Sequence, residues 1–131
     1  MTLPLMPTRK DIEELTAYLP ILYAPGFKAA STWHGGKPDE RGVIHMPYPE
    51  YHPTVEAFIH QLRKPCWMDY GYKPEEAAAM LDRIESLSLA EIRSLLTYCL
   101  RGERFSDGHW EEMIEKGYIR RILERLLALK E

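Results

Sequence analysis

Apolar and polar positions alternate at helical spacing over most of this chain. Between residues 54 and 131, apolar side chains recur three and four positions apart, which is the pattern of helices that bury one face. It predicts helices at 54–62, 75–84 and 89–102, a helix that carries Trp110 and is interrupted at Gly117, and a last helix from about residue 118. A shorter apolar stripe at 12–19 predicts one more helix, which Pro20 is expected to stop.

Local signals support several of these helix starts. Thr8 with Asp11 and Ser88 with Glu91 have the spacing of capping boxes, in which each side chain bonds the backbone of the other residue. Pro74 suits the first turn of a helix, where its missing N–H is not needed. These residues indicate where three of the helices begin.

Segment 20–53 departs from the helical pattern. It holds six of the ten prolines, the glycine pair at 35–36 and Gly42, a composition that excludes long helices. Stretches 27–33 and 42–46 are typical of short strands, so the segment predicts a small antiparallel hairpin around the polar loop 35–41.

These elements together predict a mainly α fold. We expect one small helical domain over residues 1–131, with four to six helices and an irregular Pro/Gly-rich insertion in the N-terminal half. Within it, 1–7 are expected to be flexible, 20–53 irregular or hairpin, and 54–131 helical. A length of 131 residues, with 45% apolar and 28% charged residues, suits one globular core.

Charge and cysteine content narrow the classes of function. Seventeen basic and twenty acidic residues give a net charge of −3, which does not favour a polyanionic partner. No apolar stretch reaches the length of a membrane span, and the first residues lack the features of a signal peptide. We therefore expect a cytoplasmic protein with no membrane partner, in which Cys66 and Cys99 are free thiols.

The ten residues 101–110 combine charges with aromatic rings at a predicted helix junction. They read Arg101-Gly102-Glu103-Arg104-Phe105-Ser106-Asp107-Gly108-His109-Trp110. One interpretation is an anion-binding corner, in which two arginines supply guanidinium donors and the histidine titrates near neutral pH.

The other interpretation of 101–110 is structural. Gly102 would end one helix, Asp107 would cap the next, and Phe105 and Trp110 would enter the core. At least one of the two arginines would then be buried and paired with an acid or a helix-terminal carbonyl, because a desolvated guanidinium needs a partner. The sequence leaves both interpretations open.

The same region carries a family resemblance. Its motifs are Leu96-Thr97-Tyr98, 101–105, 107–110 and 122–126, with 33–36 and 46–51 in the N-terminal half. They resemble the signature of a prokaryotic family catalogued as domain of unknown function 6508. The resemblance covers most of the chain, but it implies no mechanism and no catalytic residues, because the family is itself uncharacterised.

Histidines and aromatic residues gather in the middle of the chain. Four of the five histidines lie between residues 33 and 60, but their spacing matches no helical histidine pair and no Cys/His finger. No metal site and no cofactor are therefore predicted. The run Tyr48-Pro49-Glu50-Tyr51 is interpreted either as part of a binding groove or as an irregular segment that its aromatic rings hold on the helices.

Two further kinds of chemistry have weak signals. Cys99 lies on an apolar helical stripe, where an inert, buried thiol is expected rather than a nucleophile. The arginines at 120, 121 and 125 are offset by acids, since 101–131 holds seven basic and seven acidic residues. Nucleic-acid binding is not favoured by that balance.

The function most consistent with the sequence is a binding or protein-interaction module. Its recognition surface is expected where the aromatic insertion meets 101–110, with a protein or a small anionic ligand as partner and a homo-oligomer left open. The candidate ligand-binding residues are Arg101, Arg104, Trp110, Trp33, His34 and Tyr51.

The alternative is a small hydrolase or transferase acting on an anionic substrate. His109 would be its general acid or base, Asp107 would orient the imidazole and Arg104 would hold the anion. Such an enzyme requires a pocket lined by His109, Arg104 and at least one of Trp33, His34 and Tyr51.

Overall fold

A computed structural model describes residues 6–44, 48–102 and 109–130, without the side chains of 31–34, 48 and 49. These residues form seven α-helices, one 3-10 helix and two strands. In chain order they are α1 (Arg9–Thr16), α2 (Leu19–Leu22), β1 (Ala30–His34), β2 (Tyr48–Tyr51), α3 (Pro53–Leu62), α4 (Pro74–Met80), η1 (Ile84–Ser86), α5 (Leu89–Gly102), α6 (His109–Glu115) and α7 (Tyr118–Leu129). The predicted mainly α fold class is confirmed.

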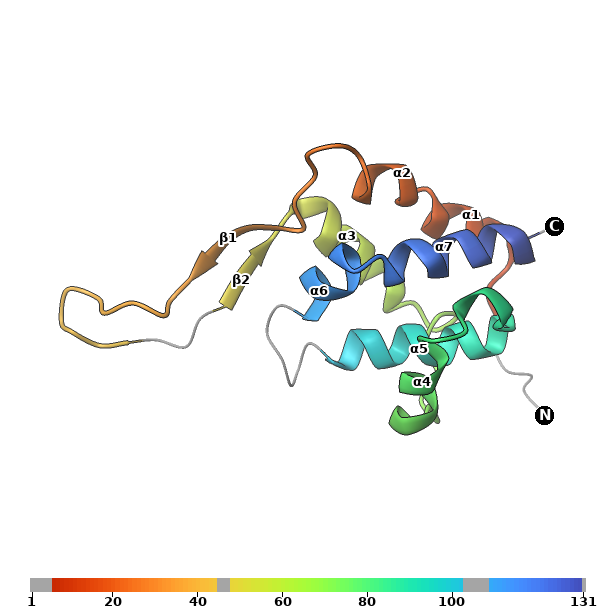
Figure 1. The fold of residues 1–131 in the computed structure, drawn as a ribbon. Coiled ribbons are helices and arrows are strands. Elements are labelled where there is room, and N and C mark those ends of the chain that lie inside the picture. Colours follow the sequence, from red (N-terminus) through yellow and green to blue (C-terminus); the bar gives the residue numbers. More distant parts are fainter. Residues whose placement is uncertain (1–5, 45–47, 103–108, 131) are drawn as a thin grey trace.

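The helices share one hydrophobic core. Buried residues from α1, α3, α5, α6 and α7 form a single cluster, in which Phe58, Trp67 and Trp110 are the largest fully buried side chains. The two strands project from one side of the helical body, away from the end at which α7 finishes (Figure 1). The core therefore depends on the helices, while the strands form an extension.

Both predicted capping boxes are present. Thr8 Oγ1 accepts a hydrogen bond from Asp11 N at 3.2 Å, and the Asp11 carboxylate accepts one from Thr8 N at 2.8 Å. Ser88 and Glu91 make the same pair of bonds at the start of α5, at 3.2 and 3.0 Å. These bonds satisfy backbone donors that the first turn of a helix leaves free.

The predicted limits of two helices need correction. Pro20 does not stop the first helix: α1 already ends at Thr16, and Pro20 lies in the first turn of the short α2, where proline is tolerated. The helix that Pro74 opens ends at Met80 rather than at Ile84, which instead begins η1. In both cases the apolar pattern continues past the residue at which the helix ends.

The hairpin exists, but its second strand lies further along the chain than predicted. β1 pairs antiparallel with β2, with His34 opposite Tyr48 and Ala30 opposite Tyr51. Part of the predicted strand 42–46 is used for a turn, in which the Asp39 carboxylate accepts hydrogen bonds from the N–H groups of residues 41 and 43. Gly42 adopts φ +80° in this turn, a conformation that suits glycine and interrupts a strand.

The start of α7 is held by residues outside the helix. Its N-cap, Gly117, has φ +81° and no side chain, and the Tyr23 hydroxyl accepts a hydrogen bond from Arg120 N at 2.9 Å. The same hydroxyl donates to Ile114 O at 2.8 Å. One phenol therefore joins the segment after α2 to the junction of α6 and α7.

The arginines of α7 are bound within the chain. Arg121 makes a two-pronged ion pair with Glu85, with both N···O distances at 2.7 Å, and its hydrogen bonds lower the pKa of Glu85 to about 2. Arg120 pairs with Glu124, and Arg125 donates to Leu87 O at 2.9 Å. These contacts do not favour a phosphate-binding role for this helix.

Candidate functional site

A pocket of about 820 Å³ opens where α3, α5, α6 and β2 meet. Its lining combines apolar and aromatic side chains with four polar or charged ones. They are Tyr51, Glu56, Ile59, His60, Arg63, Met68, Tyr70, Leu100, Arg101 and Trp110. The volume lies in the range of sites that bind small molecules.

One face of α3 and its C-cap forms a wall of the pocket. Glu56, Ile59, His60 and Arg63 are spaced by three, four and seven residues, so they lie on the same side of the helix. The neighbouring stripe, which includes Phe58, is buried in the core. The helix therefore turns one stripe to the core and the adjacent, mostly polar stripe to the pocket.

The segment 65–72 supplies another wall and is fastened to α5. The Arg93 guanidinium donates to Cys66 O at 2.8 Å and to Met68 O at 2.7 Å. Thr97 Oγ1 accepts from Asp69 N at 2.9 Å, and the Ser94 hydroxyl donates to the Asp69 carboxylate. These α5 side chains hold the segment that carries Met68 and Tyr70 of the lining.

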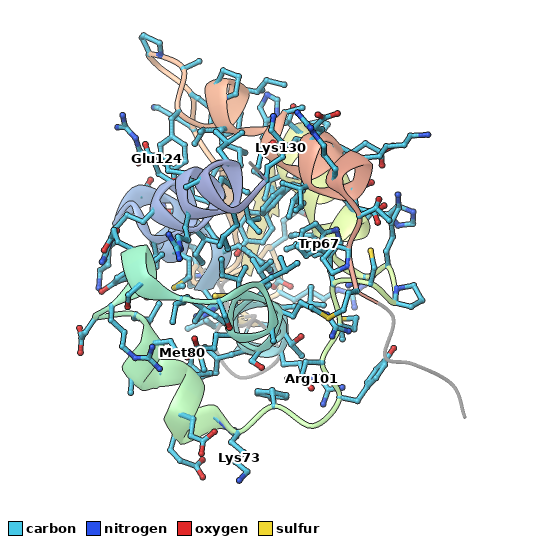
Figure 2. The ribbon with its side chains drawn as sticks, turned by 90° about the vertical axis from the view of Figure 1, so that its right-hand side faces the viewer. Trp67, Lys73, Met80, Arg101, Glu124 and Lys130 are labelled. Atoms are coloured by element: carbon cyan, nitrogen blue, oxygen red, sulfur yellow. The ribbon has the colours of Figure 1, made fainter. Side chains whose placement is uncertain are left out.

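Arg101 reaches the pocket from the end of α5. Its guanidinium carbon lies 5.4 Å from the centre of the Tyr72 ring, a cation–π contact. Arg101 lies beside the segment that leads to α4; Lys73, labelled in Figure 2, is the last residue of that segment. In the described part of the chain, neither Arg101 nor Arg63 makes an ion pair. The prediction that Arg101 or Arg104 pairs with Glu103, Asp107 or a helix-terminal carbonyl involves residues outside the described ones and stays a prediction.

Trp110 lies at the base of the pocket. Only 1% of the residue is exposed, and its ring meets Phe58 edge to face at 6.1 Å between centroids. The predicted burial of Trp110 is confirmed. The matching prediction for Phe105 lies outside the described residues.

His109 lies against α5 rather than in the pocket lining. Its ring meets Tyr98 edge to face at 6.4 Å, and it approaches Gly102 so closely that a Cβ there would lie 2.6 Å from His109 Nε2. Gly102 is needed here for space, since its φ is not among the positive ones. This contact between the His109 ring and Gly102 sets how closely the start of α6 can approach the end of α5.

The structure brings together three of the predicted site residues: Tyr51, Arg101 and Trp110 line one pocket. Trp33 and His34 lie in β1, opposite Pro49 and Tyr48, and are placed by their backbone alone. Arg104 and Asp107, with Glu103, fall outside the described residues. Their predicted roles stay predictions.

Sequence reasoning missed seven of the ten residues that line this pocket. The overlooked members are Glu56, Ile59, His60, Arg63, Met68, Tyr70 and Leu100. The helical spacing of Glu56, His60 and Arg63 was a usable signal, because three polar residues on one face can line a site. Met68 and Tyr70 carried no such signal, since contacts with a distant helix position their segment.

The remaining candidate chemistries gain no support. Both cysteines are free and buried; burial raises the pKa of Cys99 to about 12 and also raises that of Cys66, so neither is an activated thiol. Cys66 and Cys99 are not bonded to each other in the structure, and the lack of this disulfide in the native protein stays a prediction. Residues 6–44, 48–102 and 109–130 contain no group of three potential metal-ligating side chains, and no helix among them is both long and apolar enough to cross a membrane.

Comparison with known proteins identifies the family of the chain. The sequence model of a group described as Family of unknown function (DUF6508) matches residues 7–131. No curated protein and no solved structure matches the chain. The resemblance predicted from the motifs around 96–110 is confirmed, and the chain belongs to the DUF6508 family over nearly its whole length.

Proposed function

We propose that this chain is a cytoplasmic binding module and that the pocket between α3, α5, α6 and β2 is its recognition site. The observation that carries the proposal is the meeting of Tyr51, Arg101 and Trp110 in one concavity. That is the place where the aromatic insertion meets the 101–110 region. The free thiols of both cysteines fit a reducing compartment.

The composition of the lining supports binding rather than packing alone. A pocket with an apolar floor and a few polar groups at its walls offers both contact area and orientation to a ligand. Tyr70 is 72% exposed at this pocket, although burying such a ring is favourable. A bound partner would cover it.

No observation favours the alternative of a hydrolase or transferase. That hypothesis places His109 on a pocket wall, but the imidazole lies against Tyr98 and Gly102 and is not part of the lining. General acid–base catalysis needs a group within reach of the substrate. The enzyme alternative stays a hypothesis.

Fragment screening by NMR tests the proposed site. A library of neutral, anionic and cationic aromatic compounds is titrated into ¹⁵N-labelled protein, and the three indole N–H signals are assigned with Trp→Phe variants. We expect hits to shift the Trp110 signal together with the amides of Met68 and Tyr70. His60→Trp, which fills the pocket from the exposed side of α3, should abolish these hits.

Ala128→Trp is the matched control, since it adds the same ring at an exposed position of α7. Hits should persist in this variant. A screen whose hits map elsewhere, or survive His60→Trp, would contradict the proposed site.

A further inference from the structure

We infer that the pocket binds an amphipathic anion: a planar aromatic body that carries one carboxylate or phosphate group. This inference rests on the proposed function and names its class of ligand. Three observations lead to it: two arginines of the lining make no ion pair, charge is distributed unevenly along α3, and aromatic rings surround the pocket.

The pocket gathers arginines whose guanidinium groups donate to no carboxylate or carbonyl of the described chain. Most described arginine side chains bond to carboxylates or backbone carbonyls; they are Arg9, Arg83, Arg93, Arg120, Arg121 and Arg125. Among the arginines of 6–44, 48–102 and 109–130, only Arg41, Arg63 and Arg101 lack such a bond. Two of these three line the pocket. The chain as a whole has a net charge of −3, whereas the pocket lining holds these two arginines and a single carboxylate, Glu56, a local excess of positive charge that suits an anion.

Arg101 is oriented without losing its donors. Its guanidinium carbon lies over the ring of Tyr72, 5.4 Å from the ring centre, and no carboxylate or carbonyl of the described residues accepts a hydrogen bond from it. The N–H groups point outward in the guanidinium plane, where they match the two oxygens of a carboxylate or phosphate. The contact with Tyr72 therefore keeps Arg101 beside the pocket and leaves its N–H donors available to an anion.

Charge along α3 gives the site a direction. Arg63 is the C-cap residue of α3, and Glu56 lies in the first turn, roughly 10 Å away along the axis at 1.5 Å per residue. The anionic group of the ligand belongs at the Arg63 end. Glu56 would repel it from the other end and leave that part of the pocket to a neutral or hydrogen-bond-donating group.

The rest of the lining suits an apolar, flat body. Trp110 forms the base, Ile59, Met68 and Leu100 contribute aliphatic surface, and Tyr70 lies exposed at the pocket. An anion without a ring would leave this surface uncovered. A ring without a charge would leave two guanidinium groups without a partner.

Four probes separate these contributions by NMR titration: benzoate, phenyl phosphate, benzyl alcohol and inorganic phosphate. We expect benzoate or phenyl phosphate to shift the Trp110 indole signal and to bind about tenfold or more tightly than benzyl alcohol or inorganic phosphate. A preference between the two aromatic anions tells whether the ligand is a carboxylate or a phosphate ester. Either preference supports the inference.

Arginine variants test the cause of the preference. Arg63→Met and Arg101→Met should each weaken binding of the aromatic anion by about tenfold and leave benzyl alcohol unchanged. Arg41→Met, which removes an unpaired arginine from the hairpin turn, is the matched control and should change neither. Arg101→Lys keeps the charge without the planar fork and replaces Arg101→Met if that variant lowers the melting temperature.

Two results would overturn the inference. In the first, benzyl alcohol binds as tightly as the anions and the arginine variants change nothing; the pocket then recognises rings alone, and the proposed binding function stands. In the second, none of the four probes shifts Trp110 although fragments of other chemistry do; the ligand class is then wrong and the site is retained. The proposed function itself is contradicted by a different result, a fragment screen whose hits map elsewhere or survive His60→Trp.

Discussion

Trp110 serves the core and the pocket with one side chain. Its ring contacts Phe58 in the interior, and the same residue lines the pocket. A substitution at this position therefore affects folding before it affects binding. The exposed Tyr70 lines the same pocket without that structural role.

We predict that Trp110→Ala lowers the free energy of unfolding by about 3 kcal/mol, through lost burial and a cavity. Tyr70→Ala should change it by less than about 0.5 kcal/mol, as expected for a residue on the surface. Urea denaturation of both variants measures the difference. Equal losses in the two variants would contradict the assignment of Trp110 to the core.

Tyr23 gives the protein a sensitivity to alkaline pH. Burial raises the pKa of its hydroxyl from 10.0 to about 12 in the folded state. The folded state thus holds the Tyr23 proton more strongly than the unfolded state does. The contribution of this hydroxyl to the free energy of unfolding is therefore complete below pH 10 and is lost as the pH rises toward 12.

The free energy of unfolding should therefore fall more steeply above pH 10 in the natural protein than in Tyr23→Phe. Urea denaturation at several pH values between 9 and 11.5 measures the two slopes. Cys99, whose pKa is also raised, is present in both proteins and cancels in the comparison. Parallel slopes would show that the Tyr23 hydroxyl is not buried as described.

At the scale of elements, the junction of α5 and α6 depends on a close approach. The His109 ring occupies the space that a side chain at Gly102 would need. Because Gly102 is helical, alanine would favour the backbone by up to about 1 kcal/mol if the ring were absent. In Gly102→Ala the clash with the His109 ring lowers the free energy of unfolding, whereas the better helix propensity of alanine raises it. A second substitution, at His109, separates the two effects.

We predict that Gly102→Ala destabilises the natural protein but is neutral or stabilising when His109 is also replaced by alanine. The coupling free energy of this double-mutant cycle should be about 1–3 kcal/mol, the range for overpacking in a filled site. Thermal or chemical denaturation of the four proteins gives the value. Additive effects would mean that the ring does not lie over Gly102.

Helix starts and core stripes could be predicted because their causes are local. The capping pairs at Thr8 and Ser88 and the stripe of α5 depend on residues close together in sequence, and all of them are observed. The strand register could not be predicted, because the turn at Asp39 competes with strand formation. Three of the ten pocket residues could be predicted: Tyr51, Arg101 and Trp110 stood out as aromatic or charged residues, whereas Arg63 belongs to a wall that only tertiary packing brings near.

At the scale of the molecule, the ends of the described chain meet. α1 and α7 pack together, and Lys130 lies 3.8 Å from a Glu13 carboxylate oxygen. The buried cluster includes residues of both helices. A core shared by the first and last helices is expected to form and to be lost as one unit.

We therefore propose a single domain and predict one cooperative unfolding transition. Tryptophan fluorescence reports on the buried Trp67 and Trp110, and far-UV circular dichroism reports on all helices. The two signals should give the same urea midpoint. Separate midpoints, or a plateau between two transitions, would indicate more than one folding unit.

The fastening of segment 65–72 by Arg93, Ser94 and Thr97 has a kinetic consequence. A wall already bonded to α5 does not have to be ordered when a ligand arrives, so association is not limited by a rearrangement of that wall. In stopped-flow mixing, the observed rate should rise linearly with ligand concentration and reach no plateau. Arg93→Met removes the Arg93 bonds, so the wall must become ordered when the ligand binds. In that variant the observed rate should reach a plateau at high ligand concentration.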